Sequence, residues 1–176
     1  MPLLKNNQFV ADEWTMVADT DALPEGAKII VTSARLIQDW DLLAKYTGLL
    51  GVSLSNSERV EVLAPYLSQL SLIALTFPAY TDGRAYSQAK DLRLDGFRGE
   101  LRAEGNLLLD QFQYMHQVGF DSFAVNDRFS LQQWQSASRQ MSLAYQRGLY
   151  RTSGEREVWS QRHQGFAPWE EQPHAG

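Results

Sequence analysis

Apolar and polar residues follow two alternating periods along the chain. Short, mostly apolar runs are typical of buried strands, and each run is followed by a segment in which apolar residues recur at helical spacing. The predicted strands cover residues 28–32, 49–54, 72–77, 100–103 and 122–125. The predicted helices cover residues 34–46, a segment from 58 that Pro65 should kink, 82–94, about 106–119 and about 127–141. The pattern therefore predicts five consecutive βα units.

Strands and helices that alternate with short connections form parallel sheets with right-handed crossovers. We therefore predict an α/β protein with a mostly parallel sheet. Two architectures fit the pattern. One is an open, doubly wound sheet of flavodoxin-like or Rossmann-like order, which is the commoner solution at this length, and the other is a curved, half-barrel-like sheet with consecutive strands.

The two ends of the chain differ from this pattern. Residues 3–10 predict a small N-terminal β-hairpin, because Asn6 and Asn7 suit the positive φ values of a tight turn. We expect one domain over residues 1–148, with the hairpin and a further strand in residues 1–20. Residues 149–176 are rich in glycine, proline and charge and predict a loose extension. Its aromatic residues predict docking on the domain or on another subunit of a homo-oligomer: Trp159, Phe166 and Trp169.

Composition narrows the class of protein. The chain has 176 residues, of which 44% are hydrophobic and 21% charged, as in an average folded protein. It has no cysteine, which excludes disulfides, thiolate metal sites and a thiol nucleophile. A net charge of −5 argues against nucleic acid or an anionic membrane as a partner. No long apolar run or signal-peptide core is present, so we expect a cytoplasmic protein.

The richest set of polar residues follows the third predicted strand. In parallel α/β sheets, ligands bind outside the carboxyl ends of the strands, where helix N-termini present free N–H groups. Asp82 and Gly83 precede a helix on which Arg84 and Ser87, three residues apart, share a face. We predict that these four residues help to bind a small anion. The alternative is that Asp82 caps the helix, Gly83 relieves a turn and Arg84 pairs with a carboxylate.

The fourth unit adds further candidates. Arg102 lies between apolar residues in a strand that should be covered on both faces, so its guanidinium needs a partner or a ligand. We include Arg102 and Asn106 in the predicted anion-binding set, with a buried ion pair to Glu104 or Asp110 as the alternative for Arg102. Asp110 is a candidate acid or base, although a carboxylate near a helix start is also favoured by the helix dipole. Catalytic residues are otherwise unknown.

The usual cofactor and metal signatures are missing. The chain has no GxGxxG after its first predicted strand, no GxxxxGK[ST] and no GxSxG. The histidines never form an i, i+4 pair, so no metal site is predicted: His116, His163 and His174. The sequence therefore assigns no cofactor.

Several blocks resemble an uncharacterised bacterial family, the domain of unknown function nine-three-four. They are FPAYTDGRAYSQAKDLR at residues 77–93, GELRAEG at 99–105, Asp110-Gln111 and GFDSF at 119–123. The resemblance covers about residues 3–146. Two positions depart from the family pattern: Val118 stands where members commonly have cysteine, and Asn106 where many have aspartate. The first departure argues against a thiol role in this chain.

The resemblance implies a role in sulfur metabolism. Members are often labelled as oxidoreductases and are typically encoded beside assimilatory sulfite reductase. We therefore expect an accessory protein or oxidoreductase of sulfate and sulfite assimilation that binds an oxyanion or a sulfated nucleotide at the carboxyl edge of its sheet. The alternative is a non-catalytic interaction module that supports sulfite reductase through the aromatic tail and a glutamine-rich helix.

Overall fold

The computed structural model describes residues 2–125, 128–139, 143–144 and 156–157. The predicted domain boundary near Gly148 and the aromatic residues of the C-terminal extension lie outside the described residues. Strands β9 (Leu143–Ala144) and β10 (Arg156–Glu157) pair in parallel. Among the residues that are described, no helix is both long enough and apolar enough to cross a membrane.

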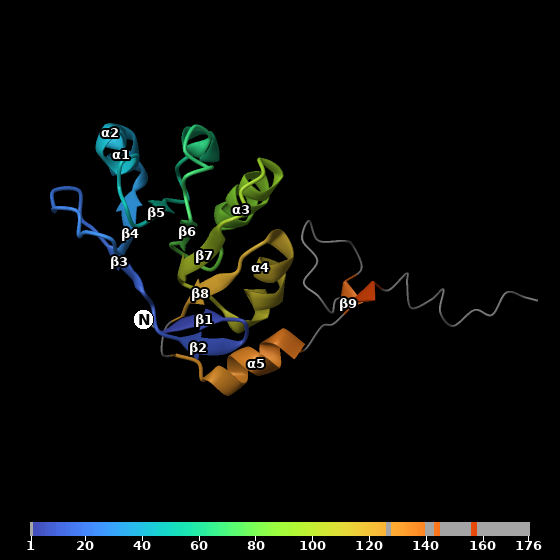
Figure 1. The fold of residues 1–176 in the computed structure, drawn as a ribbon. Helices are drawn as coiled ribbons and strands as arrows, with labels where there is room; N and C mark the ends of the chain where they lie inside the picture. The colour runs from blue at the N-terminus through green and yellow to red at the C-terminus, as the bar shows by residue number, and fades with distance from the viewer. Residues whose placement is uncertain (1, 126–127, 140–142, 145–155, 158–176) are drawn as a thin grey trace, which may run out of the picture.

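One eight-stranded sheet organises the fold, in the order β2-β1-β8-β7-β6-β5-β4-β3. Six strands follow one another in parallel: β3 (Trp14–Met16), β4 (Lys28–Thr32), β5 (Leu49–Leu54), β6 (Leu72–Phe77), β7 (Glu100–Gly105) and β8 (Ser122–Ala124). The sheet is curled (Figure 1). The predicted α/β class is confirmed, and the half-barrel alternative is the observed architecture. The flavodoxin-like or Rossmann-like order does not occur.

The N-terminal hairpin extends this sheet. Strand β1 (Leu3–Lys5) pairs antiparallel with both β8 and β2 (Gln8–Val10). Asn6 and Asn7 form its turn with φ values of 52° and 59°, which confirms the prediction.

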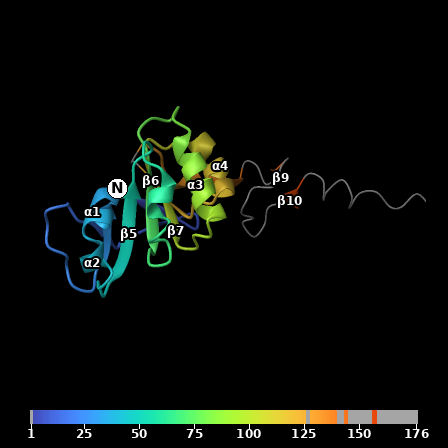
Figure 2. The ribbon, with the colours of Figure 1, turned by 90° about the horizontal axis from the view of Figure 1, so that it is seen from above.

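Helices cover the outer, convex side of the sheet (Figure 1). Figure 2 shows α1 and α2 on the β5 side and α3 and α4 on the β6 and β7 side. Their bounds are α1 Ser33–Gln38, α2 Trp40–Leu43, η1 Val60–Leu63, α3 Arg84–Leu94, η2 Leu109–Gln111, α4 Phe112–Val118 and α5 Leu131–Arg139, where η marks a 3-10 turn.

Several predicted helices are shorter than the pattern suggested. The first is divided at Asp39 into α1 and α2. The second is only the 3-10 turn η1, which ends just before Pro65, whose nitrogen has no hydrogen to continue a helix. The fourth begins later than predicted, after the turn η2, and ends at Gly119 as predicted.

The two faces of the sheet have different compositions. On the outer face, apolar strand residues such as Val52, Ile73 and Leu101 are fully buried in the main core beneath the helices. The inner face has a smaller apolar cluster of Ile30, Leu72 and Ala74 with Trp14 packed against it. Arg102 and Ser122, which are paired neighbours in β7 and β8, are also buried.

The two edges of the sheet are joined by a very short connection. Strands β2 and β3 lie at opposite edges of the sheet and run in the same direction, yet only residues 11–13 separate them. Consecutive Cα atoms are about 3.8 Å apart, so the edges lie within about 15 Å of each other. This segment, which we call the strap, therefore requires the sheet to curl.

Candidate functional site

Strand β7 carries a charged cluster on the inner face of the half-barrel. Side chains alternate between the two faces of a strand, and Leu101 and Ala103 belong to the outer core. Glu100, Arg102 and Glu104 therefore share the inner face, and ion-pair contacts link Arg102 to both glutamates. A Glu-x-Arg-x-Glu alternation in a strand was a signal that sequence reasoning did not use.

Arg102 is held by an aspartate from the strap. Its side chain is 1% exposed, and its Nη1 and Nη2 donate to Asp12 Oδ2 and Oδ1 at 2.8 and 3.0 Å. Glu104 lies 3.9 Å from Nη1. The Nε atom is buried and has no acceptor among the described residues. Of the partners that the sequence suggested, Glu104 is nearby, but Asp12 takes the main role and was missed because it lies 90 residues away.

The two glutamates of β7 have opposite electrostatic environments. Glu100 accepts hydrogen bonds from Lys5 Nζ and Ser122 Oγ, both at 2.6 Å. Burial opposes ionisation of Glu100, but these bonds and the nearby cations hold its pKa below its ordinary value. Burial raises the pKa of Glu104, assisted by the charge of Asp12 and opposed by that of Arg102.

Arg84 and Ser87 lie elsewhere, in a groove of about 310 Å³ between residues 56–61 and α3. Arg84 is the first residue of α3, and its side chain is 61% exposed. Its Nη2 donates to Asp82 Oδ2 at 2.6 Å, and Asn56 Nδ2 donates to the same oxygen at 2.5 Å. Hydrogen bonds from Arg84 lower the pKa of Asp82 to about 2. The geometry matches the alternative in which Arg84 pairs with a carboxylate.

The residues predicted to form one anion cradle therefore occupy two places. Arg84, Asp82 and Ser87 lie at the start of α3, whereas Arg102 points to the inner face of the sheet. Gly83 is the N-cap of α3. Asn106 ties two loops together, because its Nδ2 donates to the Pro78 carbonyl oxygen at 2.7 Å.

Polar side chains link successive loops along the carboxyl edge of the sheet. Thr32, the last residue of β4, donates through Oγ1 to Asp19 Oδ1 at 2.8 Å. Ser33 Oγ donates to Glu58, whose Oε2 also accepts from the backbone N–H of Ser55 at 2.7 Å. These contacts hold the loops beside the Arg84 groove in one arrangement.

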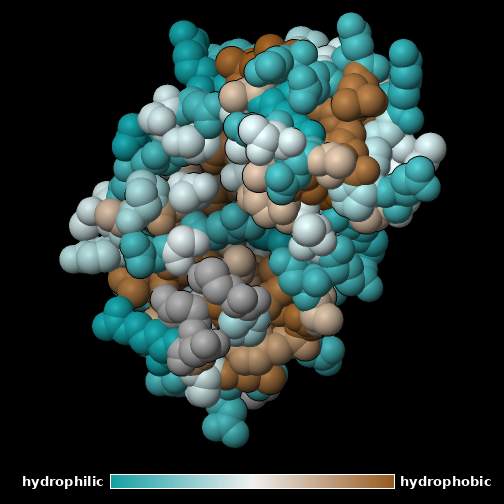
Figure 3. All heavy atoms as spheres, turned by 90° about the vertical axis from the view of Figure 1, so that its left-hand side faces the viewer, coloured by the Kyte–Doolittle hydropathy of each residue, from teal (hydrophilic) through white to brown (hydrophobic). Residues whose placement is uncertain are grey.

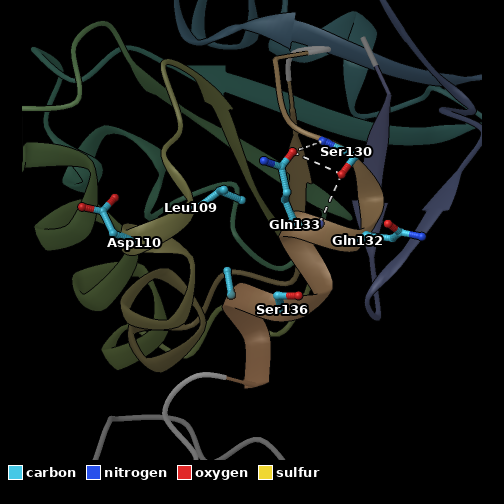
Figure 4. Close-up of a pocket in the computed structure, with 7 residues that line it drawn as sticks. Leu109, Asp110, Ser130, Gln132, Gln133 and Ser136 are labelled. Carbon is cyan, nitrogen blue, oxygen red and sulfur yellow. Dashed lines mark hydrogen bonds between the residues drawn. The ribbon is translucent and has the colours of Figure 1, made fainter.

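Asp110 lines a second groove, of about 510 Å³, between η2 and α5 (Figure 4). It is exposed, and the facing wall is formed by hydroxyl and amide side chains of α5 and its N-cap: Ser130, Gln132, Gln133 and Ser136. Ser130 and Gln133 exchange hydrogen bonds, with the Ser130 N–H donating to Gln133 Oε1 at 2.8 Å. Asp110 thus lines a groove with neutral hydrogen-bonding groups, and it is not among the carboxylates that contact Arg102 in the described part of the chain.

Arg93 and His116 stabilise the fold. Arg93 is buried, donates to the carbonyl oxygens of Gly119 and Phe97, and pairs with Asp121 at 2.5 Å. His116 lies between Phe112 and Phe123, and burial lowers its pKa. His163 and His174 lie outside the described residues. Within the described part of the chain, no group of three or more His, Asp or Glu side chains is placed to hold a metal ion.

Comparison with known proteins identifies one family. Residues 51–154 match the bacterial protein of unknown function (DUF934). The chain belongs to this family. The DUF934 match includes the Arg84 groove, strand β7 and α5, whereas the hairpin and the strap precede it. No curated protein matches the chain.

Proposed function

We propose that this DUF934 protein binds a small anionic metabolite in the Arg84 groove and serves bacterial sulfate and sulfite assimilation. The ligand class is a sulfur oxyanion or a sulfated or phosphorylated nucleotide. The observation that carries the proposal is the placement of two exposed guanidinium groups, Arg59 and Arg84, on facing walls of one groove at the carboxyl edge of the sheet.

The local chemistry supports an anion at this position. Arg84 begins an eleven-residue helix, whose N-terminal N–H groups and dipole favour negative charge. Ser57 and Ser87 add hydroxyl donors within the groove. The groove also contains Glu58, Glu61 and Asp91, so a ligand with hydrogen-bond donors as well as an anionic group suits it better than a bare oxyanion. A sulfated or phosphorylated nucleotide has both.

The existing ion pairs leave room for such a ligand. Arg59 pairs with Glu61 and Arg84 pairs with Asp82, and these are pairs between exposed cations and carboxylates of the same turn. Ion pairs between exposed side chains contribute little to stability, because water screens both charges. A ligand with two negative charges can therefore replace Asp82 on Arg84 at small cost.

The sulfur context is what the family resemblance implies, because members of that family are typically encoded beside assimilatory sulfite reductase. Whether the chain is an oxidoreductase or an accessory protein depends on the source of electrons. Because the chain has no cysteine, a reductive role requires electrons from a bound cofactor or a protein partner.

Calorimetric titration tests the ligand. Wild-type protein, Arg84→Ala and the control Lys90→Ala are titrated with sulfite, sulfate and adenosine phosphosulfates. Lys90 is an exposed cation of the same helix that does not line the groove, so its loss changes net charge equally. We expect binding that weakens at least tenfold in Arg84→Ala and not in Lys90→Ala. Absence of heat with every ligand would refute the proposal.

A growth experiment tests the pathway. The gene is deleted, and the strain is supplied with sulfate, sulfite, sulfide or cysteine as its sole sulfur source. We expect growth on cysteine and, among the inorganic sources, on sulfide alone, which places the protein at the reduction of sulfite. Unchanged growth on sulfate would contradict a role in assimilation.

A second candidate function is an interaction module that supports sulfite reductase without chemistry. It is favoured by the groove between η2 and α5, whose walls are mainly neutral amide and hydroxyl groups (Figure 4). Co-purification with sulfite reductase, lost in Gln132→Glu combined with Ser136→Glu and retained in Arg84→Ala, would support this function over ligand binding.

A further inference from the structure

Arg102 is an unusual residue for the inner face of this sheet. Its neighbours in the paired strands are small, Ala74 in β6 and Ser122 in β8. On the same face, Trp14 packs against the apolar cluster that contains Leu72 and Ala74. Apolar side chains can therefore cover this face of the sheet. Burying a charge costs free energy that an ion pair rarely recovers in full, so stability alone does not explain Arg102.

The charges around Arg102 divide into defined pairs. Lys5 neutralises Glu100, which also accepts from Ser122. Asp12 neutralises Arg102. Glu104 lies 3.9 Å from Nη1 of Arg102 and Glu100 lies 3.5 Å from Nη2, whereas Asp12 is bound to both nitrogens at 2.8 and 3.0 Å. The shortest contacts of the Arg102 guanidinium are thus made with one carboxylate.

That carboxylate comes from an exposed segment. The three residues of the strap, Ala11, Asp12 and Glu13, are all exposed, and the Asp12 side chain is 33% exposed although it pairs with a side chain that is 1% exposed. Figure 3 faces the side of the molecule on which the strap lies and shows hydrophilic atoms across the middle of this face. Asp12 therefore stands between solvent and Arg102.

We propose that Arg102 is the binding residue of a second anion site, on the inner face of the half-barrel, in which the Asp12 carboxylate takes the place of a small carboxylate or tetrahedral oxyanion. The site is separate from the Arg84 groove, so it does not depend on the function proposed above. A ligand binds when the strap moves and releases Asp12.

The chemistry of the guanidinium defines the ligand class. Asp12 occupies the fork formed by Nη1 and Nη2, which matches a carboxylate, sulfate or phosphate equally well. The buried Nε–H, which lacks an acceptor among the described residues, lies away from this fork and forms a second two-donor edge of the guanidinium together with Nη2. An anion that binds along the Nε and Nη2 edge satisfies a donor that Asp12 does not reach.

Removing the Asp12 carboxylate tests the proposal directly. Asp12→Ala, wild type and the control Glu13→Ala are melted in sodium sulfate, sodium phosphate, sodium acetate or sodium chloride at matched ionic strength. Glu13 is the adjacent strap residue and pairs with Lys28, so its variant loses the same charge without exposing Arg102. We expect a saturable rise in Tm of Asp12→Ala with sulfate, phosphate or acetate and no such rise with chloride.

The intramolecular carboxylate should compete with external anions. Calorimetry should therefore show binding of sulfate by wild type at least tenfold weaker than by Asp12→Ala, because only the fraction with Asp12 released can bind. Adding Arg102→Lys to Asp12→Ala keeps the charge but removes the fork, and should abolish the anion-specific shift. Arg84→Ala should leave it unchanged, which separates this site from the groove.

Two results would overturn the proposal. One is a folded Asp12→Ala protein whose Tm responds to all four salts alike, which would mean that Asp12 only stabilises the fold. The other is an anion response that survives Arg102→Lys. If Asp12→Ala does not fold, Asp12→Asn retains the acceptor for the Trp14 N–H, now at 3.1 Å, and must show the same anion response.

Discussion

Asp12 and Arg102 are 90 residues apart in sequence and form a two-point ion pair, with N–O distances of 2.8 and 3.0 Å, across the inner face of the sheet. The aspartate belongs to the strap between the two edge strands, and the arginine to β7 within the sheet. The pair therefore ties the closing segment of the half-barrel to its interior.

The two halves of this pair should contribute unequally to stability. Asp12→Ala leaves a guanidinium that is 1% exposed without its main partner, and we expect a loss of about 3 kcal/mol in the free energy of unfolding. Arg102→Met should cost less, because methionine fills the space and the remaining Asp12 is 33% exposed and can be hydrated. Urea denaturation measures both. The control Glu13→Ala should lose much less than Asp12→Ala, because it breaks an ion pair that water screens. A larger loss for Arg102→Met than for Asp12→Ala would contradict this expectation.

Glu104 should make stability depend on pH above the ordinary carboxyl range. Burial raises the pKa of Glu104 in the folded protein above its ordinary value of 4.5, so the unfolded chain ionises first as the pH rises. The free energy of unfolding of wild type should therefore fall from pH 4.5 up to the raised pKa.

Glu104→Gln removes this ionisation and keeps the shape of the side chain. The variant should equal wild type near pH 4 and exceed it in stability at pH 7, as measured by urea denaturation across that range. Glu25→Gln changes an exposed carboxylate of a loop, and its free energy of unfolding should depend on pH in the same way as that of wild type. A constant difference between Glu104→Gln and wild type at all pH values would show that Glu104 does not titrate differently on folding.

His116 should contribute a pH dependence of the opposite sign. Burial lowers the pKa of His116 below its ordinary value of 6.5, so the unfolded chain takes up a proton first as the pH falls. Stability should decrease as the pH falls from 6.5 toward the lowered pKa, by at most about 1.4 kcal/mol per pH unit. His116→Phe keeps the ring contacts with Phe112 and Phe123 and should lose this slope. An unchanged slope would assign the dependence to another group.

The sequence pattern was sufficient for the order of strands and helices but not for the contacts between them. Periodicity located β4 to β8, and the chemistry of Asn6 and Asn7 located the hairpin, because both are local properties. Local patterns cannot distinguish a doubly wound sheet from a half-barrel. The distinction depends on which distant strands pair, and here on a three-residue strap between opposite edges.

The candidate site was predicted in part for the same reason. Arg84 and Ser87 are close in sequence and do share one groove. Arg102 was recognised as a charge that needs a partner, but its partner lies in a segment without any period. The side of the sheet to which Arg102 points is set by the register of β7 with β6 and β8. Nothing in the sequence around Asp12 indicates that this residue contacts the inner face of β7.

The end of β7 offers a matched pair of glycine substitutions that tests how closely β7 and β6 approach there. Gly105 has φ of +103°, and a Cβ atom added to it would lie 2.4 Å from the Phe77 carbonyl oxygen. Gly96 has a similar φ of +91°, but a Cβ atom there would meet nothing within 4 Å. Gly96→Ala should therefore lose about 1–2 kcal/mol from backbone strain alone, and Gly105→Ala should lose more because it also separates the two strands. Urea denaturation of both variants measures the difference. Equal losses in the free energy of unfolding would mean that β6 and β7 can separate at the carboxyl edge without cost.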